Sequence, residues 1–404
     1  MDRHSLRLSV AASAIAATAL TGFLAPIAAA ADDFYDPPAH LHHYSRGDLI
    51  KYDEDFELDP KTPSVGAEYR IMYRSRGAIE NAIAVTGVVV VPAGTPPPGG
   101  WPIVAWAHGT SGVGDDCAPS KHGTLYPLTW WDVYSVYVND LVEEGWIVVA
   151  TDYEGLGTPG PHTYLNAESE ARAILDSVVA TRQLVPGSSH KFAVIGHSQG
   201  AFAALRAGEL GVPKGPQGKD LDFVGTVGVG VGVLSVGELT PLFAVDWIYP
   251  LLGWLALGTQ ATHPRFDPAE LLGPTLLARL DDARELCWGE WFTSFPPPAP
   301  ENLDDILNPG FLESKAYADY SAETDVGHEQ SGPPVMIVNT DLDVFFTLEQ
   351  MEALKDRMCS NGSTVAKLQI PTGDHDLVLP LTFTQVSAWL HDRFDGEAAP
   401  NDCD

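Results

Sequence analysis

The sequence KFAVIGHSQGAFAALRAGEL, residues 191–210, joins a short apolar run, a Gly-x-Ser-x-Gly pentapeptide and a helix-favouring run. The pentapeptide alone is a weak signal, because a chain with 38 glycines produces it by chance in roughly one case in five. Its setting is informative, since a strand that turns sharply into a helix strains the central serine and exposes its hydroxyl. We therefore predict that Ser198 is a nucleophile, and that Gly196 and Gly200 let the strand and the helix pass closely.

This strand–turn–helix setting is that of the α/β-hydrolase fold, in which the base that activates the serine is a histidine late in the chain. His375 lies in a turn directly after a predicted strand, 365–370, where a mobile imidazole can reach the carboxyl edge of the sheet. We predict that His375 is the base. The other histidines after Ser198 are less suited, because two precede the last predicted strands and one lies within a predicted helix: His263, His328 and His391.

The acid that orients the base is expected in the loop after the predicted strand 334–338. Two carboxylates compete there, Asp341 and Asp343. Asp343 leaves a longer loop after the strand, so we predict that Asp343 is the acid, and Asp341 is the alternative. Asp374 and Asp376, on either side of His375, are interpreted as solvated loop charges.

Two backbone N–H groups are predicted to bind the negative charge that develops on the oxygen of the attacked group. The N–H of Gln199 lies at the start of the predicted helix, where the helix dipole favours an anion. The N–H of Thr110 follows the predicted strand 102–107 in a His-Gly turn, which is the usual place of the second donor. His108 in that turn is interpreted as a structural hydrogen-bonding residue.

Short apolar strands alternate with helices along most of the chain, which indicates a mostly parallel sheet with helices on both faces. The stretch 232–324 breaks this alternation with helical fragments and many aromatic residues. We predict an α/β-hydrolase domain over 32–404 with a largely helical cap inserted at 232–324. The predicted strands are 68–73, 83–91, 102–107, 146–150, 191–195, 334–338 and 365–370, and 223–233 is predicted as a strand and loop. One predicted helix begins after a cap at Asn166, and the others cover 201–210, 347–357 and 382–394.

The N-terminal residues have the order of a secretory signal: basic residues, an Ala-rich apolar run and small residues at a cleavage site. We predict that residues 1–31 are a signal peptide, cleaved near residues 30–31, and that the mature chain is extracellular. A transmembrane anchor is the alternative. The net charge of −31 repels nucleic acid and anionic membranes, so nucleic acid is not expected as a partner.

The chain has four cysteines, all after the predicted signal: Cys117, Cys287, Cys359 and Cys403. In an oxidising compartment an even number indicates disulfides, and four cysteines permit three pairings. Their spacing matches no zinc site. The cluster of His40, His42 and His43 is a weak candidate for metal binding, and the predicted chemistry needs no metal or cofactor.

Several segments resemble the secretory lipases of the lipase A type, a branch of the α/β-hydrolases. They run in the family's order from about residue 68 onward: WAHGT at 106–110, CAPS at 117–120, TDYEGLG at 151–157, the Ser198 pentapeptide, the Asp343 loop with Cys359, and Asp374–His375. The resemblance implies a large cap, hydrolysis of acyl esters that are often lipids, and transient contact with a lipid interface. It also implies the disulfide pairs Cys117–Cys287 and Cys359–Cys403.

The apolar stretch 247–257 within the predicted cap has two interpretations, a tunnel for an acyl chain or packing on the core. Two rival functions stay open. An acyltransferase would use the same triad to pass the acyl group to an alcohol or a sugar, and an inactive hydrolase fold would serve as a binding protein. The order of Ser198, Asp343 and His375 favours an active serine esterase or lipase that acts on a small-molecule or lipid ester.

Overall fold

A computed structural model describes residues 33–57, 62–122, 133–213, 218–234, 248–295 and 302–403. Residues Phe34–Asp404 form one compact unit. The predicted signal peptide at 1–31 and its cleavage site lie outside the described residues. So do two parts of the predicted cap, 235–247 and 296–301.

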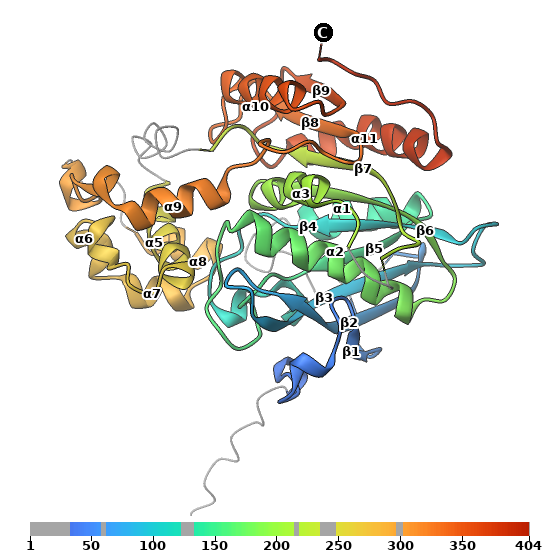
Figure 1. Ribbon diagram of the computed structural model, residues 1–404, viewed down its shortest axis with the longest axis horizontal. Helices are drawn as coiled ribbons and strands as arrows, with labels where there is room; N and C mark the ends of the chain where they lie inside the picture. The colour runs from blue at the N-terminus through green and yellow to red at the C-terminus, as the bar shows by residue number, and fades with distance from the viewer. Residues whose placement is uncertain are drawn as a thin grey trace, which may run out of the picture. The chain divides into compact units, whose positions relative to one another are not determined.

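The core of this unit is a sheet built from nine strands within the described residues. The strands are β1 (Leu49–Asp53), β2 (Val65–Arg76), β3 (Ala82–Pro92), β4 (Trp101–Ala107), β5 (Ile147–Thr151), β6 (Ser188–His197), β7 (Asp222–Val229), β8 (Val335–Thr340) and β9 (Val365–Ile370). Their order is β1-β2-β3-β5-β4-β6-β7-β8-β9, which runs from bottom to top in Figure 1. Pairs from β1 to β5 along this order are antiparallel, and pairs from β5 to β9 are parallel. The predicted mostly parallel sheet is confirmed.

Helices cover both faces of the sheet (Figure 1), as predicted. The covering helices are α1 (Val133–Glu143), α2 (Ala167–Leu184), α3 (Gln199–Leu210), α10 (Leu348–Ser360) and α11 (Val378–Asp395). Neighbouring residues of β4 serve opposite faces: Ile103 packs in the cluster with α2 and α3, and Val104 in the cluster with α1 and α11. Because both faces are covered, the inner strand β5 is buried along its whole length and is apolar up to Thr151.

The start of α2 shows a local signal acting as predicted. The side chain of Asn166 accepts a hydrogen bond from Ser169 N at 2.9 Å, which satisfies one of the free N–H groups at the helix start. Apolar residues of α2, such as Ile174 and Val178, are fully buried against the sheet. The capping residue and the apolar face together fix where this helix begins and which side it buries.

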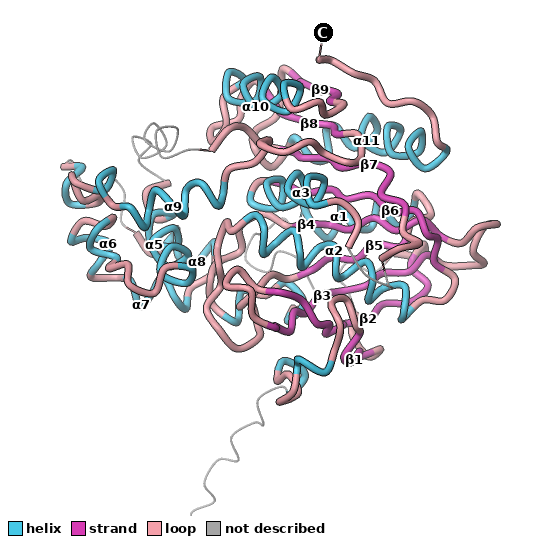
Figure 2. Tube along the Cα trace, in the orientation of Figure 1, coloured by secondary structure: helices cyan, strands magenta, loops and turns pink. Residues whose placement is uncertain are grey.

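Short helices lie between β7 and β8, where the sequence predicts a cap. They are α5 (Leu251–Thr262), α6 (Pro274–Leu277), α7 (Leu280–Glu285), α8 (Trp288–Thr293) and α9 (Lys315–Thr324), and Figure 2 shows them beyond one end of the strands. We call residues 248–295 and 302–324 the helical insertion. Two buried tryptophans hold it together, since Trp254 Nε1 donates to Ala283 O at 2.8 Å and Trp291 Nε1 donates to Pro250 O at 2.9 Å.

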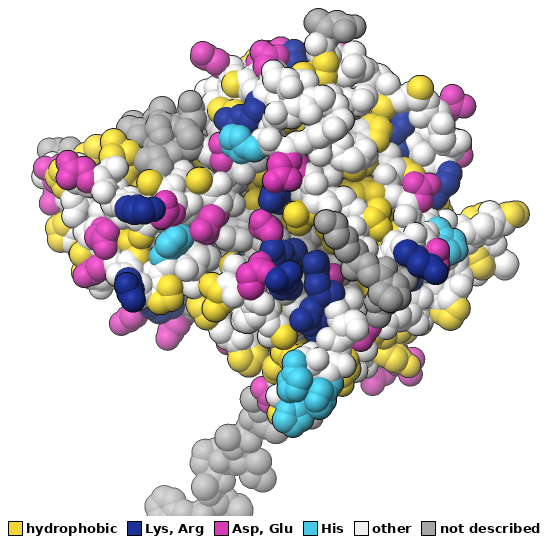
Figure 3. All heavy atoms as spheres, viewed as in Figure 1, with side chains coloured by type: hydrophobic (Ala, Val, Ile, Leu, Met, Phe, Trp, Pro, Cys, Tyr) yellow, Lys and Arg dark blue, Asp and Glu magenta, His cyan; other side chains and the backbone are white. Residues whose placement is uncertain are grey.

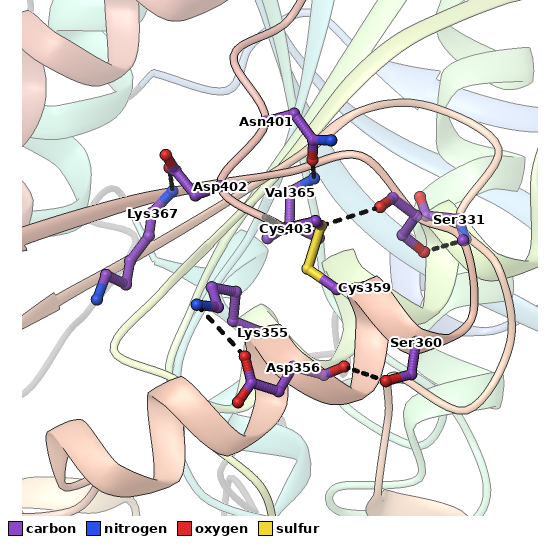
Figure 4. Close-up of a disulfide and its surroundings, with 12 residues drawn as sticks. Ser331, Lys355, Asp356, Cys359, Ser360, Val365, Lys367, Asn401, Asp402 and Cys403 are labelled. Atoms are coloured by element: carbon purple, nitrogen blue, oxygen red, sulfur yellow. Dashed lines mark hydrogen bonds and ion pairs between the residues drawn. A yellow bond between two sulfur atoms is a disulfide. The ribbon is translucent and has the colours of Figure 1, made fainter.

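The C-terminal residues cover the edge strand β9. Asp402 N donates to Val365 O at 2.7 Å, and the Asp402 carboxylate accepts from Lys367 N at 2.8 Å. Figure 4 shows this segment beside the disulfide that joins Cys403 to Cys359 of α10. The otherwise unpaired edge of the sheet is therefore occupied, which protects it from pairing with another chain.

The described residues carry many acidic side chains on the surface. Figure 3 shows acidic side chains scattered over one face of the molecule. No helix of the described chain is long and apolar enough to cross a membrane.

Candidate active site

Ser198 lies at the sharp turn between β6 and α3. Its φ of 54° and ψ of −119° are strained for a residue with a side chain. A Cβ on Gly196 would lie 1.9 Å from Gly200 O, and a Cβ on Gly200 would lie 2.0 Å from Ala107 O. Only glycine fits at these two positions, because the strand and the helix approach too closely for any side chain. The pentapeptide therefore has the geometry that presents a serine hydroxyl.

Asp343 and His375 come together from the loops after β8 and β9. His375 Nδ1 lies 2.8 Å from Asp343 Oδ2. The second carboxylate oxygen of Asp343 accepts hydrogen bonds from the backbone N–H groups of Phe345 at 2.8 Å and Phe346 at 3.0 Å. The carboxylate is thus held in place on one side by its own loop and presents its other oxygen to the imidazole.

The charges of this pair reinforce each other. Burial opposes the charged imidazolium, but the charge and the hydrogen bond of Asp343 outweigh burial and raise the pKa of His375. Burial also opposes the charged carboxylate, yet the charge and hydrogen bond of His375 lower the pKa of Asp343. Asp343 is therefore ionised near neutral pH and stabilises a proton on His375 when one arrives.

Among the described residues, the second ring nitrogen of His375 is free of any hydrogen bond that would occupy it. His375 Nε2 is buried and has no hydrogen-bond partner within the described chain, so its contact with Ser198 Oγ is not formed in this structure. Both residues line the same pocket. Such contacts are often long without substrate and tighten when it binds.

The other carboxylates near the pair have different partners. Asp341 is exposed and accepts from Gln369 Nε2 at 2.7 Å. Asp374 Oδ1 accepts from Leu377 N at 2.9 Å at the start of α11. Of the two acids between which the sequence leaves a choice, the structure therefore brings Asp343, and not Asp341, to the imidazole.

Thr110 and Gln199 lie close to Ser198. Gln199 is the first residue of α3, so its backbone N–H has no acceptor within the helix. Thr110 follows Gly109, where an added Cβ would lie 3.3 Å from Ser198 Cβ. Both Thr110 and Gln199 line the pocket with Ser198. Their backbone N–H groups are placed to receive a negative oxygen next to the serine.

The pocket has a volume of about 450 Å³ and is lined mainly by apolar side chains. Leu251 and Leu255 of α5 and Trp288 of α8 form the wall on the helical insertion. Phe202 and Leu165 contribute from the main domain. This volume is within the range of small-molecule sites, and its wall suits an apolar substrate group.

Comparison with known proteins places the chain in a family. The family model of the secretory lipases matches residues 128–402. The chain belongs to the secretory lipase family. It is therefore a carboxylic ester hydrolase by family, and membership agrees with the extracellular location predicted from the sequence.

Individual relatives are distant but cover most of the chain. A probable inactive lipase of Mycobacterium tuberculosis is 24% identical over 92% of this chain and 84% of its own length. Lipase A of Arthroderma benhamiae is 22% identical over 94% of this chain and 82% of its own length. The solved structure of Candida antarctica lipase A has a TM-score of 0.73 at 20% identity and covers 92% of this chain and 87% of that one. The α/β-hydrolase fold is thus confirmed.

In this family member, a disulfide connects the loop after β4 to the helical insertion. Cys117 is bonded to Cys287, which precedes α8, and Trp288 N donates to Ser111 O at 2.9 Å beside it. The two disulfides are Cys117–Cys287 and Cys359–Cys403, the pairs that the resemblance implies. One side of the pocket is therefore covalently attached to the loop that carries Thr110.

Several polar residues of the site carry no motif and were not found from the sequence. The amide of Gln199 donates to Glu170 at 2.7 Å and contacts His162 at 3.2 Å, and Tyr164 Oη lies 2.9 Å from Thr110 Oγ1. Burial raises the pKa of Glu170 well above its usual range. His108 donates to Gly109 O, as expected for a structural histidine. Among the described residues, no group of His, Cys, Asp or Glu could hold a metal ion, and the cluster at 40–43 is not an exception.

Proposed function

We propose that the chain is a secreted serine hydrolase that cleaves carboxylic esters with apolar acyl groups, lipid or other, through Ser198, Asp343 and His375. The observation that carries this proposal is the Asp343–His375 hydrogen bond of 2.8 Å, made by a histidine that lines the same pocket as the strained Ser198. The residues 1–31 serve as its export signal, with cleavage near residues 30–31. N-terminal sequencing of the exported protein tests that site.

The proposed reaction passes through an acyl-enzyme. His375 Nε2 takes the proton of Ser198 as its oxygen attacks the ester carbonyl. The backbone N–H groups of Gln199 and Thr110 stabilise the oxyanion, while Asp343 stabilises the imidazolium. The alcohol leaves with the proton from His375. Water then loses a proton to His375, attacks the acyl carbon and releases the acid, and Ser198 regains its proton.

The helical insertion supplies the proposed acyl site, and we assign it the role of the cap that the sequence predicts at 232–324. Leu251 and Leu255, from the apolar stretch 247–257, line the pocket directly. Other residues of α5, such as Trp254, are buried within the insertion and support this wall. The two interpretations of the stretch therefore apply to different faces of one helix, and the acyl chain is assigned to the face with the two leucines.

Contact with a lipid interface is proposed at the mouth of the pocket. Leu342, Val344 and Leu381 are exposed, at 58%, 50% and 48%, and Val344 also lines the pocket. A side chain added at Gly373 would meet Leu381, and Thr340 Oγ1 contacts both Gly373 O at 2.8 Å and Leu342 N at 3.3 Å. The exposed leucines therefore flank the loop that bears His375, where an apolar interface would deliver the substrate.

Labelling with a fluorophosphonate tests the function directly, because the serine oxygen attacks phosphorus and fluoride leaves. We expect one adduct, located on Ser198 by peptide mass spectrometry, and none in S198A. Absence of an adduct would favour the alternative, a binding protein without activity. The mycobacterial relative is a probable inactive lipase.

A panel of p-nitrophenyl esters from acetate to laurate then tests the acyl site. We expect kcat/KM to rise from acetate toward octanoate, and a strong preference for acetate would contradict an apolar acyl pocket. Product analysis in the presence of a primary alcohol separates hydrolysis from acyl transfer. Free acid as the main product supports the proposal, whereas a new ester as the main product would make the chain an acyltransferase.

A further inference from the structure

His197, the residue before Ser198, is a buried histidine without a role in the proposed reaction. Its side chain is the last of β6 and is 1% exposed. Its Nε2 lies 2.8 Å from the backbone oxygen of His375, and its Nδ1 lies 2.8 Å from the hydroxyl of Tyr134 in α1. The imidazole thus connects three elements that are far apart in the sequence.

The partners of His197 determine where its proton lies. A backbone carbonyl can only accept, so Nε2 carries the hydrogen and donates it to His375 O. In a neutral ring Nδ1 is then an acceptor, and Tyr134 donates its hydroxyl to it. Burial, followed by the charge of His375, lowers the pKa of His197 to about 4, although Asp376 and Asp343 favour the charged form. The ring is therefore neutral near pH 7.

The backbone of the loop that bears His375 is held at two points. Thr340 Oγ1 donates to the loop at Thr372 O and Gly373 O, at 3.0 and 2.8 Å, before the histidine. His197 holds the carbonyl of His375 itself. The two imidazole rings also pack together, with their centroids 4.8 Å apart. Asp343 fixes the direction of the His375 ring, but only the contact with His197 ties its backbone to the residue next to the nucleophile.

We infer that His197 is a positioning residue: its Nε2–H holds the backbone carbonyl of His375, and Tyr134 keeps it in the tautomer that can do so. The inference rests on the proposed function of Ser198 and His375. One side chain then sets the spacing between the nucleophile and its base. A misplacement of about 1 Å in such a pair can cost about a hundredfold in rate.

Substitutions of His197 that differ in reach test the inference. In H197Q the amide N–H can take the place of Nε2–H, whereas the amide in H197N is too short to reach His375 O. We expect H197N to lower kcat by about 10- to 100-fold with KM changed less than threefold, and H197Q to regain at least a third of the wild-type kcat. H391L is the control, because His391 of α11 contacts Glu144, the residue after α1, and does not line the pocket.

Tyr134 is tested through a double-mutant cycle. If Tyr134 acts through the tautomer of His197, Y134F lowers kcat several-fold in the wild-type background and adds nothing in H197N. Additive losses would show that Tyr134 acts independently and would overturn its assigned role. Nitrogen NMR of the His197 ring adds a readout without activity: we expect Nε2–H in the wild type and a growing share of Nδ1–H in Y134F.

The rate of fluorophosphonate labelling separates this inference from the function. If the wild type is not labelled, the proposed function fails. If the wild type is labelled, and H197N has the same labelling rate and kcat, His197 has no positioning role although the function stands. Equal losses of kcat in H197N and H197Q, at matched thermal unfolding temperatures, would also overturn the inference. The inference requires that an N–H donor, which H197Q keeps, is sufficient to hold His375 O.

Discussion

Gly230 lies against the imidazole of His375. A Cβ on Gly230 would lie 2.9 Å from Cε1 and 3.1 Å from Nδ1 of that ring. Gly230 follows β7 directly, has a φ of 63°, and donates its N–H to Val338 O at 2.9 Å. The absence of a side chain at Gly230 therefore leaves the space in which the imidazole of His375, the proposed base, lies.

We predict that G230A lowers kcat by about 10- to 100-fold, because the added methyl displaces the imidazole of His375. G396A is the matched control, since Gly396 also has a positive φ, 83°, but nothing lies within 4 Å of an added Cβ. Both substitutions carry the same kind of backbone strain, about 1 kcal/mol. Kinetics and urea unfolding separate the two effects, and equal kcat values in the two variants would contradict the prediction.

The disulfides provide a second matched pair. Cys117–Cys287 closes 170 residues of sequence and Cys359–Cys403 closes 44. Removing either by paired Cys→Ser substitutions is expected to cost about 2–5 kcal/mol of unfolding free energy, more for the longer loop. Only the loss of Cys117–Cys287 is expected to lower activity as well, because it releases the wall that carries Trp288. Urea unfolding and ester kinetics check this, and unchanged kcat/KM in C117S/C287S would contradict it.

Most of the sheet could be predicted because its strands are short, apolar and separated by turn residues. The run of β-branched residues in β3 and the apolar β4 are local patterns that need no knowledge of their neighbours. The same holds for Asn166, whose capping bond lies within three residues. Nearby residues determine such features, so tertiary packing does not change the secondary structure that the local sequence favours.

Among the strands and α-helices of the described residues, β1 and α1 were not predicted. The sequence of β1, LIKYD, lacks a clean alternation, because this strand lies at the sheet edge and pairs only with β2. The sequence of α1, VYSVYVNDLVE, is rich in valine and tyrosine, which favour strands. It is nonetheless a helix, since that places Tyr137, Val138 and Leu141 together on the sheet. Packing overrides the local preference there.

In the candidate site, too, some residues could be predicted from local sequence and others depend on contacts between distant segments. The pentapeptide and the chain order pointed to Ser198 and His375, but the choice of Asp343 rested on loop length alone. The hydrogen bond that separates Asp343 from Asp341 joins residues from two loops and has no sequence signature. Glu170 is similar: carboxylates are common in a first helical turn, yet nothing local indicates that this one is buried against Gln199.

The Asp343–His375 pair predicts the pH dependence of activity. Because the pKa of His375 is raised above the ordinary 6.5, kcat/KM should fall as the pH drops through a value above 6.5, where the imidazole becomes protonated. The same shift contributes folding stability at low pH that is lost as the pH rises through the raised pKa. A pH–rate profile checks the first statement, and an acid limb below 6.5 would contradict it.

Removing the acid should change that profile in a defined way. In D343N burial is no longer opposed by the carboxylate charge, so the pKa of His375 falls and the acid limb moves to lower pH. We expect kcat to fall about 10³- to 10⁴-fold. D341N is the control, because Asp341 contacts Gln369 and not the imidazole. A larger loss in D341N than in D343N would exchange the roles of the two carboxylates.

The proposed interface predicts a selective effect on aggregated substrate. Each leucine transferred fully from water into lipid contributes about 1.5–3 kcal/mol, so L342S/L381S should weaken binding to phosphatidylcholine vesicles at least about tenfold. The ratio of activity on a tributyrin emulsion to activity on soluble p-nitrophenyl acetate should fall with it. L303S/L312S is the control, because these leucines are equally exposed, at 49% and 57%, on the helical insertion.

Charge determines which interface the same surface accepts. Asp341, Asp374 and Asp376 are exposed beside the two leucines, in a chain with a net charge of −31. Anionic phosphatidylglycerol vesicles should therefore bind more weakly than phosphatidylcholine vesicles at low salt, and the difference should shrink as salt screens the repulsion. If L342S/L381S and the control L303S/L312S lose the same share of emulsion activity, the surface through which the substrate enters lies elsewhere. Tighter binding to the anionic vesicles would show that local charge at the mouth does not govern the contact.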